Sequence, residues 1–149
     1  MSMPVKRIAV NFGGGYVPGL HAVITGTVLA AHELGWEVVG IRDGFDGLLA
    51  PERYADGGLL TLTPQIVENL SAGGSAILGN ATRTDPFRVR QVSAENMVEE
   101  VDRSGELIAK IAAERIDAVV SVVGPRALSI LFRLHRQGLR TVCVPTSVE

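Results

Sequence analysis

The 149-residue sequence has little cysteine, few aromatic residues and no excess of charge of either sign. Its single cysteine, Cys143, excludes a disulfide scaffold and a cysteine-rich zinc site, and its apolar surroundings predict a buried structural thiol. Fourteen basic against sixteen acidic residues give a net charge of −2, which argues against nucleic-acid or anionic-membrane partners. No apolar run approaches the ~18 residues of a membrane span. We therefore expect a soluble, cytoplasmic protein that binds small molecules or other proteins.

Length and composition predict one domain over residues 1–149. Apolar residues make up 46% of the chain and charged residues 20%, which suffices for one ordinary core. The 17 glycines exceed the usual share of about 7%, and they gather in clusters at 13–15, 57–58 and 73–74. Clusters without a repeating period are typical of loops shaped around a ligand.

The first third of the chain has the pattern of a strand, a helix and a second strand. An apolar run over 8–12 leads into the glycine-rich loop 13–19, and helical spacing over 20–34 stops at Gly35. A second apolar run covers 36–41. This succession is a βαβ unit, so its two strands are predicted to be parallel with a right-handed crossover.

The remainder of the chain continues the alternation. The predicted elements are a short helix from Thr63-Pro64 to Leu70, an amphipathic helix within 93–116, a buried strand over 118–123, a helix ending at Gly138 and a strand over 141–144. The pattern is that of an α/β protein with an open, mostly parallel, doubly wound sheet and helices on both faces. In such sheets the carboxyl ends of the strands carry the ligand.

Three places in the sequence could bind phosphate. The loop 13–19 offers backbone amides at a helix start, although it matches neither G-x-G-x-x-G nor a lysine-bearing phosphate loop, and a tight packing turn explains it equally well. Arg83 suits a bidentate phosphate contact or is a solvated surface arginine. Arg126, directly after a strand, either holds a phosphate or begins a surface helix. The three histidines show no metal-ligand spacing and are interpreted as structural or surface residues: His21, His32 and His135.

Three segments, in order, resemble the amino-terminal half of the phosphofructokinase family. The segment 13–22 reads GGGYVPGLHA, where the family has Ser/Thr-Gly-Gly-Asp-Ala-Pro-Gly-Met-Asn-Ala. The segment 34–48 reads LGWEVVGIRDGFDGL and is close to the family pattern. The third segment runs from Gly73 to Phe87 and has one extra residue before Arg83.

The resemblance implies a phosphoryl-transfer function. The phosphoryl donor would be ATP with Mg²⁺ or pyrophosphate, and the acceptor would be fructose 6-phosphate, as in glycolysis. The implied donor-binding residues are Gly14, Gly15, Tyr16, Arg83, Thr84 and Gly124. Loop amides and arginines suit this chemistry, because phosphoryl transfer depends on positioning and on neutralising the phosphate oxygens.

The sequence departs from the family pattern at its catalytic positions. Gly124 to Leu128 stands where the family has Gly-Gly-Asp-Gly-Ser, so a magnesium-binding aspartate is replaced by Arg126. Glu149 falls in the place of the catalytic base, one methylene longer than the family's aspartate. Ala127 and Thr146 stand where pyrophosphate users tend to have Asp and Lys. Arg126 and Glu149 are therefore the candidate catalytic residues.

These departures leave three interpretations open. The chain is the donor-binding domain of a phosphofructokinase-type enzyme, a catalytically altered regulatory subunit or nucleotide-binding module of the same fold, or an unrelated doubly wound domain that binds another phosphorylated metabolite. The resemblance places most of the sugar-phosphate site in a carboxyl-terminal half and a neighbouring subunit. We therefore expect a homo-oligomer or a missing half, and no turnover by this chain alone.

Overall fold

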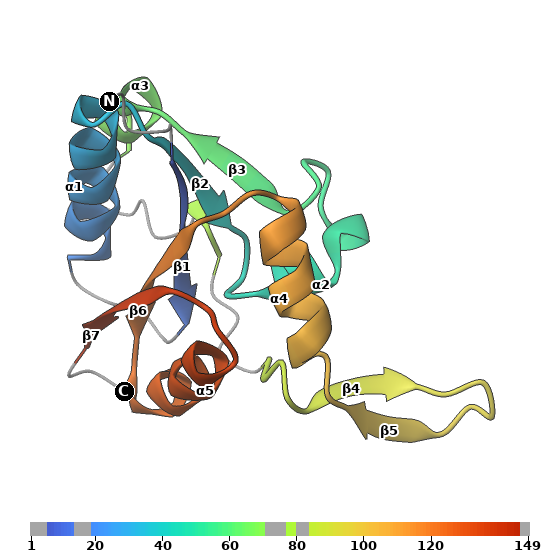
Figure 1. Cartoon of the computed structure of the whole chain (residues 1–149). Helices are drawn as coiled ribbons and strands as arrows, with labels where there is room; N and C mark the ends of the chain where they lie inside the picture. Colours follow the sequence, from blue (N-terminus) through green and yellow to red (C-terminus); the bar gives the residue numbers. More distant parts are fainter. Residues whose placement is uncertain (1–5, 14–18, 71–76, 80–83, 147–149) are drawn as a thin grey trace.

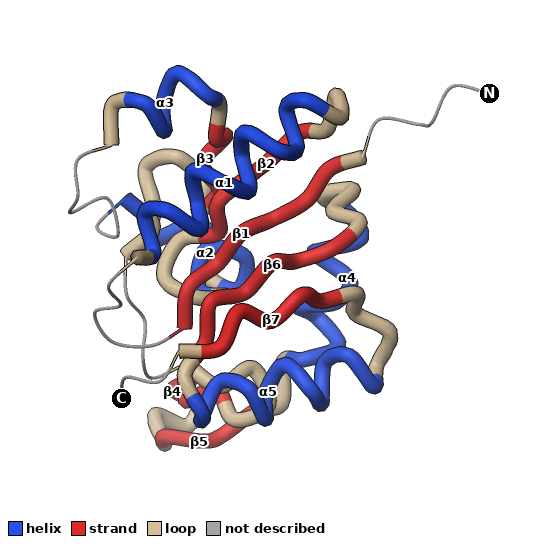
Figure 2. Tube along the Cα trace, turned by 90° about the vertical axis from the view of Figure 1, so that its left-hand side faces the viewer, coloured by secondary structure: helices blue, strands red, loops and turns tan. Residues whose placement is uncertain are grey.

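The computed structural model describes residues 6–13, 19–70, 77–79 and 84–146, and its centre is a five-stranded sheet (Figure 1). Its strands lie side by side in the order β3-β2-β1-β6-β7 (Figure 2). They are β1 (Arg7–Gly13), β2 (Glu37–Ile41), β3 (Leu59–Leu62), β6 (Ala118–Val123) and β7 (Thr141–Pro145). The helices are α1 (Leu20–Glu33), α2 (Asp46–Leu49), the 3-10 helix η1 (Pro51–Arg53), α3 (Pro64–Glu68), α4 (Ser104–Ala113) and α5 (Pro125–Arg136).

The sheet is mostly parallel, as predicted. β1 pairs in parallel with both β2 and β6, and β6 pairs in parallel with β7. The exception is β3, which the sequence did not predict and which pairs antiparallel with β2. A strand of four residues is too short to show an apolar period. Its pairing depends on contacts with β2, which the sequence of β3 itself does not indicate.

Apolar layers cover both faces of the sheet, which confirms the predicted α/β fold. On one face, α1 and α3 pack on a cluster that includes Val10, Phe12 and Ile24. On the other, α2, α4 and α5 pack on a cluster that includes Ile41 and Leu107. Side chains alternate between the faces along each strand, so β1 and β6 contribute to both clusters.

Local signals in the sequence placed several element ends correctly. α1 is followed by Gly35, whose φ of +73° is a left-handed conformation that glycine adopts without strain, and Trp36 N–H then donates to Ala31 O at 2.8 Å. Thr63 Oγ1 accepts from Ile66 N–H at 3.3 Å and caps α3. The predicted strand over 118–123 has the bounds of β6.

The single amphipathic helix predicted within 93–116 is wrong in its first half. Residues 89–101 form a hairpin of β4 (Val89–Val92) and β5 (Val98–Val101), and only Ser104–Ala113 is helical. Valines at this spacing are compatible with a helix or with a strand. Asn96 allows the hairpin turn, because it adopts a φ of +63°. Figure 1 shows this hairpin projecting away from the rest of the molecule.

One burial prediction needs correction at the β7 side of the molecule. Cys143 is only half-buried, because β7 is an edge strand of the sheet. In α5, Leu131 and Leu134 are buried, whereas Leu128 and Phe132 are exposed. Within the described residues, no helix has the length and apolar character needed to cross a membrane.

Candidate functional site

The carboxyl ends of β1, β6 and β7 meet at one edge of the sheet. Gly124 N–H, just after β6, donates to Gly13 O at the end of β1 at 3.3 Å, and Thr146 N–H, just after β7, donates to Val123 O at 2.9 Å. A Cβ on Gly13 would lie 3.4 Å from the Ala127 Cβ, so the end of β1 contacts the first turn of α5. This is the edge at which open α/β sheets bind ligands.

Arg126 lies in the first turn of α5 at this edge. Gly124 is the N-cap residue, no side chain caps it, and Pro125 begins the helix. Arg126 is exposed to solvent. Helix amides and an arginine guanidinium both favour an anion, so the turn can bind phosphate oxygens.

The same turn does not fit a magnesium ion. Magnesium prefers oxygen ligands, above all carboxylates, yet the first turn of α5 contains no acidic residue. The Arg126 side chain is a cation that only donates hydrogen bonds. Elsewhere among the described residues, no three histidine, cysteine or carboxylate side chains gather closely enough to hold a metal ion.

A buried polar pair links β1 and β6 to the turn after β2. Ser121 Oγ donates to Asn11 Oδ1, and Asn11 Nδ2 donates to Gly44 O at 3.2 Å. Both side chains are buried, so their polar atoms require these partners. The pair thereby holds the turn at residues 42–45 against the sheet at its carboxyl edge.

This turn and the start of α2 carry two carboxylates that bind neighbouring hydroxyl groups. Asp46 accepts from Thr84 Oγ1 at 3.1 Å, and Asp43 accepts from the Tyr54 hydroxyl at 2.8 Å. Burial raises the pKa of Asp46, and the Thr84 hydroxyl and Arg53 partly oppose the rise. Burial also raises the pKa of Tyr54, and its hydrogen bond to Asp43 adds to the effect. Thr84, a predicted donor-binding residue, is thus fixed by Asp46, which the sequence did not single out.

The residues that follow Thr84 are held firmly by the core. Phe87 is buried, its N–H donates to Asp85 Oδ1 at 2.9 Å, and the Arg133 guanidinium lies 3.7 Å above its ring. Pro86 O accepts from Arg103 N–H at 2.7 Å. The segment 84–87 is therefore anchored to the body of the protein on both sides of Asp85.

Arg103 is itself oriented by Glu106. Its guanidinium donates to both Glu106 oxygens, at 2.7 and 2.6 Å, and to Leu49 O at the end of α2 at 2.8 Å. These hydrogen bonds lower the pKa of Glu106 to about 2. The carboxylate thus stabilises the fold when it is ionised.

Replacing Glu106 by glutamine is expected to lower the free energy of unfolding near neutral pH by at most about 1 kcal/mol, since the Glu106 side chain is 43% exposed. Because the pKa of the folded state lies below the usual 4.5, this contribution is present above that value and is lost as the pH falls toward about 2. Urea unfolding of both proteins at neutral and acid pH checks this. A stability difference that grows in acid would contradict it.

Of the predicted site residues, the structure places Gly124, Arg126 and Thr84. Gly124 and Arg126 lie together at the start of α5, and Thr84 lies beside α2 on Asp46. The other predicted site residues lie outside the described residues: Gly14, Gly15, Tyr16, Arg83 and Glu149. Asp46 lies within the segment 34–48 that resembles the family pattern, but the sequence does not indicate its contact with Thr84, 38 positions away.

The described structure thus has the sheet edge at which open α/β proteins bind ligands, and comparison with known proteins identifies its family. The sequence model described as Phosphofructokinase matches residues 7–149. The ATP-dependent 6-phosphofructokinase of Chloroflexus aggregans is 33% identical over 100% of this chain and 39% of its own length. The pyrophosphate–fructose 6-phosphate 1-phosphotransferase of Dictyoglomus thermophilum is 31% identical over 99% of this chain and 37% of its own length. The chain belongs to the phosphofructokinase family.

Solved structures agree on the fold. Phosphofructokinase of Pichia pastoris in the T-state matches 99% of this chain and 17% of its own chain, with a TM-score of 0.73 and 18% identity. The chain spans about two fifths of the length of the curated relatives described above.

Proposed function

We propose that this chain is the phosphoryl-donor-binding half of a 6-phosphofructokinase-type phosphotransferase. In this proposal the donor, ATP or pyrophosphate, binds at the carboxyl edge beside Gly124 and Arg126, with Thr84 at its flank. The observation that carries the proposal is the meeting of β1, β6 and the first turn of α5 at that edge. By the family resemblance, Gly14, Gly15, Tyr16 and Arg83 complete the donor site.

Arg126 gives the proposed site its distinctive chemistry. A guanidinium neutralises phosphate oxygens directly and binds two of them at once. It would therefore supply positive charge where the family uses a magnesium-binding aspartate. We infer that donor binding at this site does not depend on magnesium.

A second candidate function follows from the same residue. A regulatory subunit or nucleotide-binding module needs only to bind the nucleotide, and the first turn of α5 lacks the carboxylate that a metal-assisted transfer would use. Only the phosphotransferase would use fructose 6-phosphate as an acceptor. In that enzyme, Glu149 would act as the base that takes the proton of the sugar hydroxyl.

Replacing Arg83 by alanine is expected to weaken ATP or pyrophosphate binding about tenfold or more, because a hydrogen bond to a charged group contributes about 1.5–3 kcal/mol. Isothermal calorimetry measures the change, and circular dichroism verifies the fold. Arg90→Ala, on the projecting hairpin, is the matched control. Unchanged donor affinity in Arg83→Ala would remove Arg83 from the proposed donor site.

The chain alone is expected to show no turnover of fructose 6-phosphate with either donor. Its relatives are about two and a half times as long, and the family resemblance places most of the sugar-phosphate site in the part not represented here. A coupled assay with ATP or pyrophosphate tests this. Turnover that requires both donor and sugar would refute it.

A further inference from the structure

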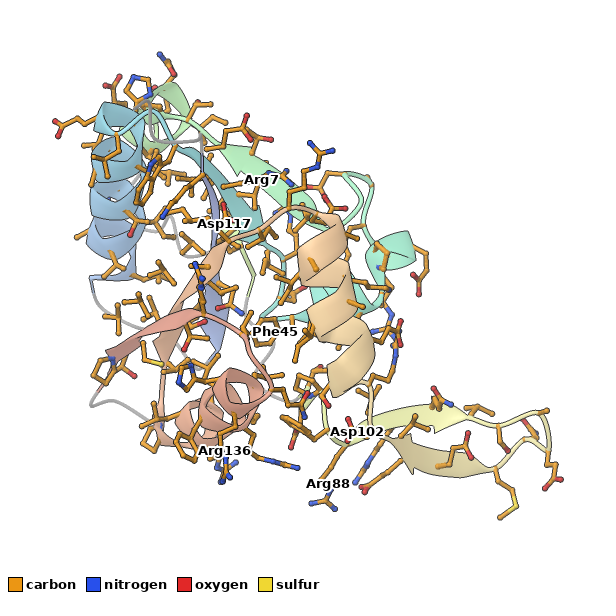
Figure 3. The ribbon with its side chains drawn as sticks, viewed as in Figure 1. Arg7, Phe45, Arg88, Asp102, Asp117 and Arg136 are labelled. Atoms are coloured by element: carbon orange, nitrogen blue, oxygen red, sulfur yellow. The ribbon has the colours of Figure 1, made fainter. Side chains whose placement is uncertain are left out.

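The β4–β5 hairpin is the least enclosed part of the described structure. Figure 3 shows Arg88 and Asp102 at its base and the two strands extending beyond α4. Three of the eight large apolar side chains exposed among the described residues lie on it: Val92 at 64%, Met97 at 65% and Val98 at 73%. A hairpin of two strands is marginal in water unless something packs on it.

One face of the hairpin has an ordered arrangement of charge and apolar surface. The strand register pairs Arg90 with Glu100 and Val92 with Val98, and side chains two residues apart share a face. This face, here called the valine face, therefore has an Arg–Glu pair toward the base and a valine pair toward the tip.

The opposite face has no comparable arrangement. It consists of Val89 and Val101 at the base and Gln91 with Glu99 beyond them. Val89 packs against the core of the protein, and Gln91 Nε2 donates to Glu99 Oε1 at 3.0 Å. The groups on this opposite face have partners within the chain, whereas Val92 and Val98 on the valine face are exposed to solvent.

We propose that the valine face is a dimerisation surface that packs against the same face of a second copy of this chain. A two-fold axis along the strands brings β4 of one copy over β5 of the other. Val92 then faces the partner's Val98, and Arg90 faces the partner's Glu100. The valine face is thus complementary to itself in both charge and polarity, as an isologous interface requires.

Two short strands bury less than the ~1,200 Å² of a stable interface. The dimer is therefore weak and reversible, and its population rises with protein concentration. Within the chain, the Arg88 guanidinium donates to both Glu100 carboxylate oxygens, at 3.2 and 3.4 Å. This exposed ion pair contributes little to stability, and a carboxylate can accept further hydrogen bonds, so Glu100 can also bind Arg90 of the second copy.

The test uses charge reversal on the full chain, followed by sedimentation velocity over a concentration series. Arg90→Glu alone and Glu100→Arg alone each place like charges opposite one another, so each is expected to remain monomeric. An equimolar mixture of the two restores both Arg–Glu contacts and is expected to dimerise like the parent chain. The double variant Arg90→Glu/Glu100→Arg is expected to do the same.

Glu99→Arg, on the opposite face, is the matched control and is expected to associate like the parent chain. Since the mixture contains only the two single variants, its dimerisation also shows that both are folded. The proposal is overturned if the parent chain is monomeric throughout, if either single variant dimerises unchanged, or if the mixture stays monomeric.

Discussion

Replacing Arg126 by alanine is expected to weaken binding of pyrophosphate and ATP by about 10-fold to 100-fold. The change removes a fixed positive charge and all the guanidinium hydrogen-bond donors from the first turn of α5, and a hydrogen bond to a charged group contributes about 1.5–3 kcal/mol. The α5 amides remain, so weak binding persists. Titration calorimetry of both proteins measures the loss directly.

Arg136→Ala provides the control, because it removes the same charge from the last turn of the same helix. Arg136 lies beside the Phe132 ring, at 6.0 Å from its centroid. The control is expected to bind the donors as the parent chain does. Equal weakening by both substitutions would mean that only net charge matters and would remove Arg126 from the site.

Gly58→Ala is expected to destabilise the fold by about 2–5 kcal/mol, a large share of the ~5–15 kcal/mol of a typical domain. Gly58 has a φ of +89°, which costs an alanine about 1–2 kcal/mol. Its new Cβ would also overlap the Gly47 carbonyl, lying 2.6 Å from the carbonyl carbon. That obstacle is backbone, so no side chain can move aside, and overpacking adds about 1–3 kcal/mol.

The neighbouring Gly57 supplies the comparison. Its φ is +79°, but no atom lies within 4 Å of the position its Cβ would take. Gly57→Ala is therefore expected to lower the free energy of unfolding only by the conformational cost of about 1–2 kcal/mol. Denaturant unfolding of the two variants separates strain from overlap, and equal stabilities would show that the approach of Gly47 and Gly58 is unimportant.

Local sequence patterns predicted the elements whose burial is regular. β6 is buried on both faces and reads as a continuous apolar run, and α1 has its apolar residues at helical spacing before Gly35. The β4–β5 hairpin escaped prediction because Met97, Val98 and Val101 suit a helix as well as a strand. These residues are exposed because the hairpin projects from the body of the protein, and no local sequence pattern predicts that projection.

The candidate site was predicted where a motif lies on one element and missed where it depends on contacts between distant segments. Gly124 and Arg126 follow a strand end and could be placed from the sequence. The hydrogen bond of Asp46 to Thr84 and the Asn11–Ser121 pair join residues 38 and 110 positions apart. Nothing near any of these residues in the sequence indicates its partner.

The most direct test of the proposed donor site is calorimetric titration of the chain with pyrophosphate and with ATP, once with a chelator and once with magnesium. Because the proposal places Arg126 where the family resemblance has a metal-binding carboxylate, we expect the same dissociation constant in both conditions for at least one of the two donors. Binding that occurs only when magnesium is present, or no binding of either donor in either condition, would contradict it.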